Sequence, residues 1–155
     1  MTRDQALRHL SNPNRTEAAI ALQDFVLSFD GSHQFTTAQN VVFVVNELTN
    51  QVMMNGLAGF FYNYSGEVAP RAAQSLAAIG AIETANRFSE IMLNFGIEPY
   101  PVDTNERRLF LEKFDYELRN DWNEFEEWFF AFTENIEELT LSYIASNIDN
   151  FLGLS

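Results

Sequence analysis

The feature that most constrains the fold is the spacing of large apolar residues in the last third of the chain. They recur in alternating steps of three and four, at Trp122, Phe125, Phe129, Phe132, Ile136, Leu139 and Tyr143. Steps of this size place side chains on one side of an α-helix, so the stripe predicts an amphipathic helix with one buried face. Asp121 followed by Glu124 resembles a capping box at its start, and an N-cap at Thr133 would divide it in two.

Helical spacing also recurs between turn-forming residues along the rest of the chain. The run Val41–Val45 is rich in β-branched residues, which favour strands. The apolar stripe nevertheless continues from Ala38 to Val52, and no second strand-like run is available to pair with it. We therefore predict an all-α fold: one compact domain over residues 1–155 with roughly six to eight helices, including a short helical extension over residues 1–12.

Three residues predict helix boundaries in the middle of the chain. Pro70 suits the first turn of a helix, where its missing N–H is no loss. Gly96 suits the end of the helix that follows Gly80. Thr104 is the expected N-cap of the next helix, because its hydroxyl can accept from a free backbone N–H.

The charge of the chain is strongly negative and unevenly spread. Twenty-two acidic residues face nine basic ones, which gives a formal net charge of -13. Residues 103–155 alone hold 13 acidic and 4 basic residues. Phosphate backbones and anionic membranes need Lys and Arg to displace their counterions, so direct nucleic-acid or membrane binding is not expected. We expect most arginines to sit in local ion pairs, because Arg pairs carboxylates in a fixed geometry.

No residue pattern points to catalysis, a cofactor or a metal site. The chain has no cysteine, and His9 and His33 stand apart from any metal-ligand spacing. Phosphate-binding and nucleophile motifs do not occur, and the single lysine, Lys113, lies between Glu112 and Phe114. Carboxylates on a wet helix face keep ordinary acidity. We therefore expect no enzyme, and neither a secretory signal nor a transmembrane segment is evident, which favours the cytoplasm.

An unusual cluster of aromatic and small polar residues lies in the middle of the chain. It runs from Asn46-Glu47 through Met54-Asn55-Gly56-Leu57 and Phe60-Phe61-Tyr62-Asn63-Tyr64-Ser65-Gly66 to Ile79-Gly80-Ala81. This cluster, with the closing segment Leu141–Phe151, resembles the DMP19-like family over residues 36–151. Two departures stand out: the Asn-Gly-Gly-Phe of the family appears here as Met54-Asn55-Gly56-Leu57, and its glutamine before the aromatics is Gly59.

The resemblance implies an all-helical fold and, from the member that names the family, mimicry of double-stranded DNA by an acidic protein, with a homodimer as its form. The motif residues themselves read as structural, because they suit a turn, a helix start and the core. They are Glu47, Gly56, Phe60, Phe61, Asn63, Ser65, Gly66 and Pro70. A lesser alternative is a small-molecule site or an enzyme built from the polar side chains Asn46, Glu47, Asn55 and Asn63.

Our leading hypothesis is a noncatalytic acidic binding protein whose partner is a basic protein, such as a DNA-binding transcription factor. On the predicted helix, Glu124, Glu127, Glu134 and Glu138 fall opposite the apolar stripe. The expected contact residues are Asp115, Glu117, Asp121, Glu124, Glu127, Glu134 and Glu138. The alternative is an interaction or immunity-type protein that recognises its partner by shape, in which the charge serves only solubility.

Overall fold

The computed structural model describes residues 1–113 and 119–154 and is helical throughout. The described residues form nine α-helices, eight of them with seven or more residues, and no strand, which confirms the all-α prediction. The helices are α1 (Arg3–Leu10), α2 (Arg15–Leu27), α3 (Thr37–Tyr62), α4 (Ala69–Ala78), α5 (Ile82–Leu93), α6 (Thr104–Leu111), α7 (Asn120–Phe130), α8 (Ile136–Ser146) and α9 (Ile148–Leu152), with a 3-10 helix η1 (Tyr64–Val68) after α3.

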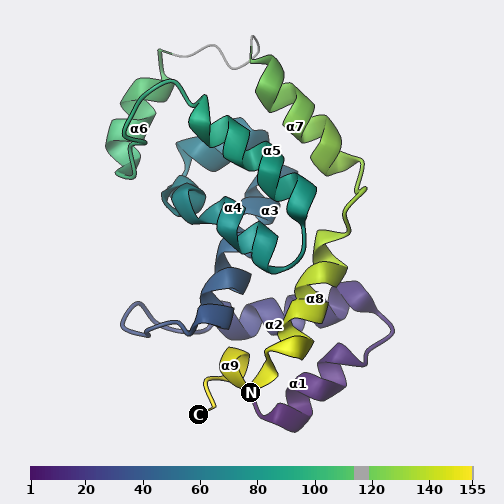
Figure 1. The fold of residues 1–155 in the computed structure, drawn as a ribbon. Helices are drawn as coiled ribbons and strands as arrows, with labels where there is room; N and C mark the ends of the chain where they lie inside the picture. Colours follow the sequence, from purple (N-terminus) through teal and green to yellow (C-terminus); the bar gives the residue numbers. More distant parts are fainter. Residues whose placement is uncertain (114–118, 155) are drawn as a thin grey trace.

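Helix α3 runs through the middle of the molecule and joins its two ends (Figure 1). Helices α4, α5, α6 and α7 gather around one end, and α1, α2, α8 and α9 around the other, where the N- and C-termini lie close together. The apolar run Val41–Val45 is part of α3, so the helical interpretation of this segment is confirmed. One cluster of buried side chains fills each end, and both clusters draw residues from α3.

Helix α3 is bent at Gly56, which adopts φ 68° and ψ -176°. This region of backbone conformation is open almost only to glycine. At the bend, the backbone N–H of Leu57 donates to a carboxylate oxygen of Glu126 from α7 at 2.8 Å. The glutamate therefore caps the second half of α3, and the bend ties α3 to α7.

A fully buried arginine, Arg107 of α6, fastens the end of α3 to the loop before α6. Its guanidinium donates to the carbonyls of Phe61 and Asn63 and, on the other side, to those of Pro101 and Val102. It also donates to the hydroxyl of Thr104, at 3.2 Å. All of the contacts that hold this cation are therefore made by neutral groups, which must replace the water it has lost.

Gly66 leaves space for the Arg107 guanidinium, and Glu67 supplies a negative charge near it. An added Cβ at Gly66 would lie 2.6 Å from the guanidinium Nε, so only glycine permits this approach. The hydroxyl of Thr104 donates a hydrogen bond to the Glu67 carboxylate at 2.9 Å. This hydroxyl therefore bridges the buried cation and a carboxylate. The Tyr100 hydroxyl donates to the Gly66 carbonyl at 2.6 Å. We call Arg107 and the groups around it, in residues 61–67 and 100–104, the Arg107 corner.

The predicted helix over the apolar stripe is two helices, and its predicted caps are wrong. Helix α7 has Arg119 at its N-cap, because the carboxylate of Asp121 pairs with the Arg119 guanidinium instead of capping the helix. Helix α7 ends at Phe130 and α8 begins at Ile136, with Asn135 as its N-cap in place of Thr133. Glu134 and Glu138 consequently do not continue the outward row that starts on α7.

Two further predicted boundaries shift by a few residues. Asp103 caps α6 by accepting from the Glu106 N–H, because the predicted cap, Thr104, is buried beside Arg107. Helix α5 ends at Leu93, before Gly96. Pro70 lies in the first turn of α4, as predicted.

Replacing Gly56 with alanine should destabilise the protein by about 2 kcal/mol or more, because the backbone there is strained for any side chain. The new Cβ would also lie 2.7 Å from the Glu126 carboxylate and displace the cap on Leu57. Gly31→Ala is the matched control, since nothing lies within 4 Å of a Cβ at that position. Urea unfolding measures both variants, and equal losses would contradict the role given to the bend.

Arg107→Ala should lower the free energy of unfolding by at least about 3 kcal/mol, because buried carbonyls lose their donors together. Arg108→Ala is the control: its guanidinium donates to the Tyr62 carbonyl near the surface, so the expected loss is within about 1 kcal/mol. Urea unfolding followed by circular dichroism gives both values. A loss below that of the control would show that Arg107 does not fasten this corner.

Candidate functional site

The predicted contact residues do not form a single row. Asp115 and Glu117 lie outside the described residues. Asp121 is bound by Arg119 at 2.8 Å, and Glu138 is bound by Arg15 of α2 at 2.9 Å. Hydrogen bonds from these arginines lower the pKa of both carboxyls. Asp121 and Glu138 therefore already have cationic partners within the chain.

Glu134, in the segment between α7 and α8, caps the N-terminus of α5. Its carboxylate accepts hydrogen bonds from the backbone N–H of Thr84 at 2.7 Å, from the Thr84 hydroxyl at 2.6 Å and from the Glu83 N–H at 3.3 Å. Burial opposes the charge, but the hydrogen bonds from Thr84 and Glu83 outweigh it and lower the pKa of Glu134. A carboxylate at the N-terminus of α5 is also favoured by the helix dipole.

The two remaining predicted residues, Glu124 and Glu127, are exposed on α7, and α5 also carries exposed glutamates. Helices α5 and α7 pack together, and the start of α5 meets the end of α7, where the Trp128 indole N–H donates to the Thr84 hydroxyl at 3.0 Å. Exposed glutamates of both helices form a surface that we call the acidic ridge. Its residues are Glu83, Glu90, Glu124 and Glu127.

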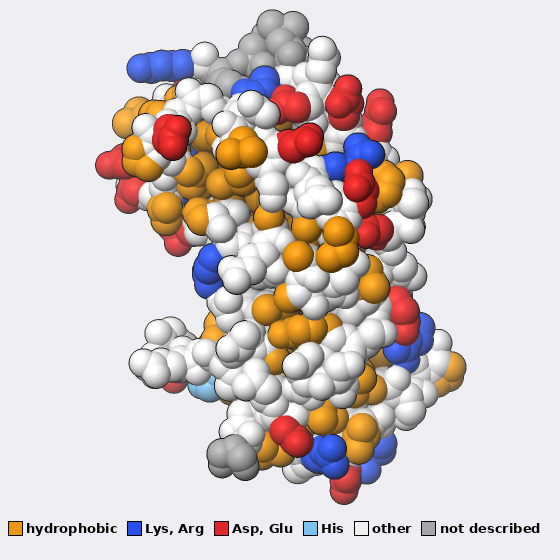
Figure 2. Space-filling view, viewed as in Figure 1, with side chains coloured by type: hydrophobic (Ala, Val, Ile, Leu, Met, Phe, Trp, Pro, Cys, Tyr) orange, Lys and Arg blue, Asp and Glu red, His pale blue; other side chains and the backbone are white. Residues whose placement is uncertain are grey.

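Figure 2 shows acidic side chains gathered over the α5 and α7 end of the molecule, with basic side chains few among them. Arg87 of α5 is the basic side chain that the described contacts bring to the ridge. It pairs with Glu83 at 3.0 Å and lies over the Trp128 ring, 4.4 Å from its centroid. The ridge is therefore net negative, with one internal ion pair.

The sequence alone gave no sign of Glu83 and Glu90 as ridge members. They lie on a helix distant in sequence from α7, and only the fold packs that helix against α7. Among the described residues, ion pairs account for four arginines, Arg3, Arg15, Arg87 and Arg119. Arg107 and Arg108 donate instead to backbone carbonyls, so the expectation that most arginines form ion pairs holds only in part.

The aromatic and turn residues of the motif contact the chain's own core and backbone. Phe60 and Phe61 are fully buried. The Ser65 hydroxyl donates to the Phe60 carbonyl at 2.8 Å, and the Asn63 carbonyl accepts from Arg107 at 2.7 Å. At Gly59 an added Cβ would lie 2.2 Å from the Cβ of Asn55, so this backbone has no room for a side chain there.

The polar side chains of the alternative site bond along α3. The Asn46 side-chain oxygen accepts from Asn50 at 3.0 Å, while Asn55 and Asn63 both donate to Gln51, at 3.3 and 3.2 Å. Glu47 is partly buried, and this burial raises its pKa. The amides thus satisfy one another along the helix surface.

Within residues 1–113 and 119–154, no group of three or more His, Asp or Glu side chains could hold a metal ion. No helix in that part of the chain is long and apolar enough to cross a membrane.

With the fold and the acidic ridge in view, we compared the chain with known proteins. The family model described as DMP19-like protein matches residues 33–147, which is most of the chain. The chain belongs to the DMP19-like family. In this DMP19-like protein the matched segment begins before α3 and ends after α8, so it includes the bend at Gly56, the Arg107 corner and the acidic ridge. Comparisons with curated proteins and with solved structures found no match.

Replacing Glu134 with glutamine should lower stability near neutral pH by about 1 kcal/mol, the scale of a lost helix cap. The folded pKa of Glu134 lies below its ordinary value, so its contribution is present above the unfolded pKa of about 4.3 and is lost as pH falls through the folded pKa. The difference between wild type and variant should therefore shrink in acid. Glu127→Gln is the exposed control, and urea unfolding from neutral to acid pH measures all three proteins. A difference independent of pH would contradict the capping role.

Proposed function

We propose that this DMP19-like chain is a noncatalytic protein that binds a basic DNA-binding protein through the acidic ridge and thereby competes with duplex DNA. The observation that carries the proposal is the exposure of Glu90, Glu124 and Glu127 on two packed helices. The arginines that the described residues place on these helices, Arg87 and Arg119, are already paired with carboxylates. Arg and Lys side chains that bind phosphates can bind such carboxylates in the same way.

The rigidity of the two helices supports this role. Glu124 and Glu127 are three residues apart on one helix, a spacing that sets side chains about 5 to 6 Å apart at Cβ. The charges of duplex DNA follow one another at a comparable scale. The packing of α5 on α7 fixes a second row beside the first, so the partner meets a preformed surface and orders little of it on binding.

The excess negative charge of the whole chain supports it further. A net charge of -13 attracts a basic partner over distances of the order of the Debye length, about 8 Å at physiological salt, and repels nucleic acid. We expect this encounter to take place in the cytoplasm. As part of the same proposal, the chain forms a homodimer, as its resemblance to the family implies. The alternative is a partner recognised by shape, for which the charge is incidental.

The test is capture of partners from the native cell extract by the wild-type chain, by a ridge variant and by a control variant. Glu124→Lys with Glu127→Lys reverses two ridge charges. Asp4→Lys with Asp24→Lys makes the same change of net charge on α1 and α2, at the opposite end of the molecule. The dissociation constant for the captured protein should rise about tenfold or more for the ridge variant and less than about threefold for the control.

The second arm of this test measures how salt and duplex DNA affect binding of the captured protein. Binding by the wild type should weaken by about tenfold or more between 0.1 and 0.5 M salt, on the order expected for several exposed charge pairs, and duplex DNA should displace the chain. Equal losses for the two variants, or binding that ignores both salt and DNA, would overturn the proposal and favour recognition by shape.

A further inference from the structure

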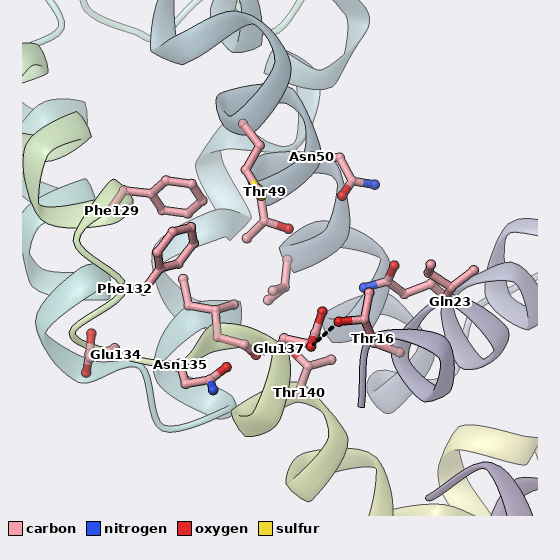
Figure 3. A pocket seen from close by; sticks show the side chains of 15 residues that line it. Thr16, Gln23, Thr49, Asn50, Phe129, Phe132, Glu134, Asn135, Glu137 and Thr140 are labelled. Atoms are coloured by element: carbon pink, nitrogen blue, oxygen red, sulfur yellow. Dashed lines mark hydrogen bonds between the residues drawn. The ribbon is translucent and has the colours of Figure 1, made fainter. Parts of the chain in front are cut away.

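A groove opens where α7 ends, between α2, α3 and the segment that leads into α8 (Figure 3). Its volume is about 380 Å³, at the small end of the range of ligand pockets, which suits one long side chain better than a whole helix. Phe129 and Phe132 enter it from the α7 side, and Gln23 and Thr16 border it on the α2 side.

The groove keeps large apolar side chains in contact with water. Ile20, Met53 and Phe132 line it and are 52%, 56% and 59% exposed. Phe132 also has φ 52°, a left-handed conformation that is rare for any residue but glycine. The turn that imposes this conformation, closed by the bond from the Phe132 N–H to the Phe129 carbonyl, holds the ring at the groove. Strained residues of this kind often mark binding sites.

The charge in the groove is negative. Its lining contains the carboxylates Glu134 and Glu137 and no Lys, Arg or His. Glu134 is engaged at the start of α5, whereas Glu137 accepts a single hydrogen bond, from the Thr16 hydroxyl to its Oε1 at 3.2 Å. Among the described residues nothing hydrogen-bonds its Oε2. Arg15, whose charge also interacts with that of Glu137, has two of its nitrogens on Glu138.

Apolar walls with one available carboxylate are complementary to a cation on an apolar stem. Arginine has this form: its methylenes lie along apolar surface, its planar head stacks on aromatic rings, and its N–H groups pair with a carboxylate. An aliphatic side chain would offer no donor to the Oε2 of Glu137, and an acidic one would be repelled by the carboxylate.

We propose that this groove receives an arginine side chain of the basic protein partner, with its guanidinium at Glu137 and its stem against Ile20, Met53 and Phe132. The inference rests on the proposed function for the identity of the partner. It adds a specific pocket at the end of α7 to the proposed contact residues, and such a pocket supplies the shape recognition that a charged surface lacks.

The test uses small probes and no partner, so that its failure is distinct from failure of the ridge variants. n-Butylguanidinium is titrated into the full chain and is compared with n-butylurea, its neutral analogue of the same shape. The methyl groups of Ile20, Met53 and Ile136 report on the groove by NMR. The methyl groups of Met54 and Met92, which do not line it, serve as the control signals.

The expected result is a saturable shift of the groove methyls, with butylguanidinium binding about threefold or more tighter than butylurea. Glu137→Gln should remove this preference, while Glu17→Gln, an equal charge change on α2 outside the groove, should keep it. The proposal is overturned if both probes bind alike, if Glu137→Gln keeps the preference, or if the groove signals shift with protein concentration alone, which would show a second copy in the groove.

Discussion

The arrangement of the end of the molecule that carries α4, α5, α6 and α7 depends on the hydrogen bonds of the buried Arg107 guanidinium. The guanidinium collects carbonyls from the end of α3, from the turn at Asn63 and from the loop before α6, groups that would otherwise be buried without donors. Gly66 is needed for its approach, and Thr104 links it to Glu67. The core phenylalanines Phe60 and Phe61 can pack beneath it only because the backbone around them is satisfied.

The carboxylates of this protein divide between two roles. Glu126 and Glu134 cap helices to which they do not belong, and Asp121 and Glu138 pair with arginines. These four acids stabilise the packing of α7 and α8 and have little left to offer a partner. Within the part of the chain that the structure describes, the exposed glutamates of α5 and α7 make no such contacts, apart from the ion pair of Glu83 with Arg87. A count of acidic residues alone would have overstated the surface available for binding.

Much of the fold could be predicted from the sequence, because helical spacing and turn residues are local signals. The stripe through Val41–Val45, the helix start at Pro70 and the burial of Trp122 are of this kind, and all are confirmed. The capping roles were missed, since Glu126 and Glu134 bond to helices far away in sequence. The burial of Arg107 was missed for the same reason: its acceptors come from segments that only the fold brings together. Of the four residues of the acidic ridge, only the two on α7, Glu124 and Glu127, were predicted from the sequence.

The family, the ridge and the groove support one account in which charge attracts a basic partner and a pocket selects it. The most direct measurement is zero-length carbodiimide cross-linking of the chain to its captured partner, which joins carboxylates to lysines in contact, followed by mass spectrometry. The account predicts cross-links from Glu90, Glu124 and Glu127. Cross-links confined to Asp4, Asp24 and Asp149, at the end of the molecule that carries α1, α2 and α9, would contradict it.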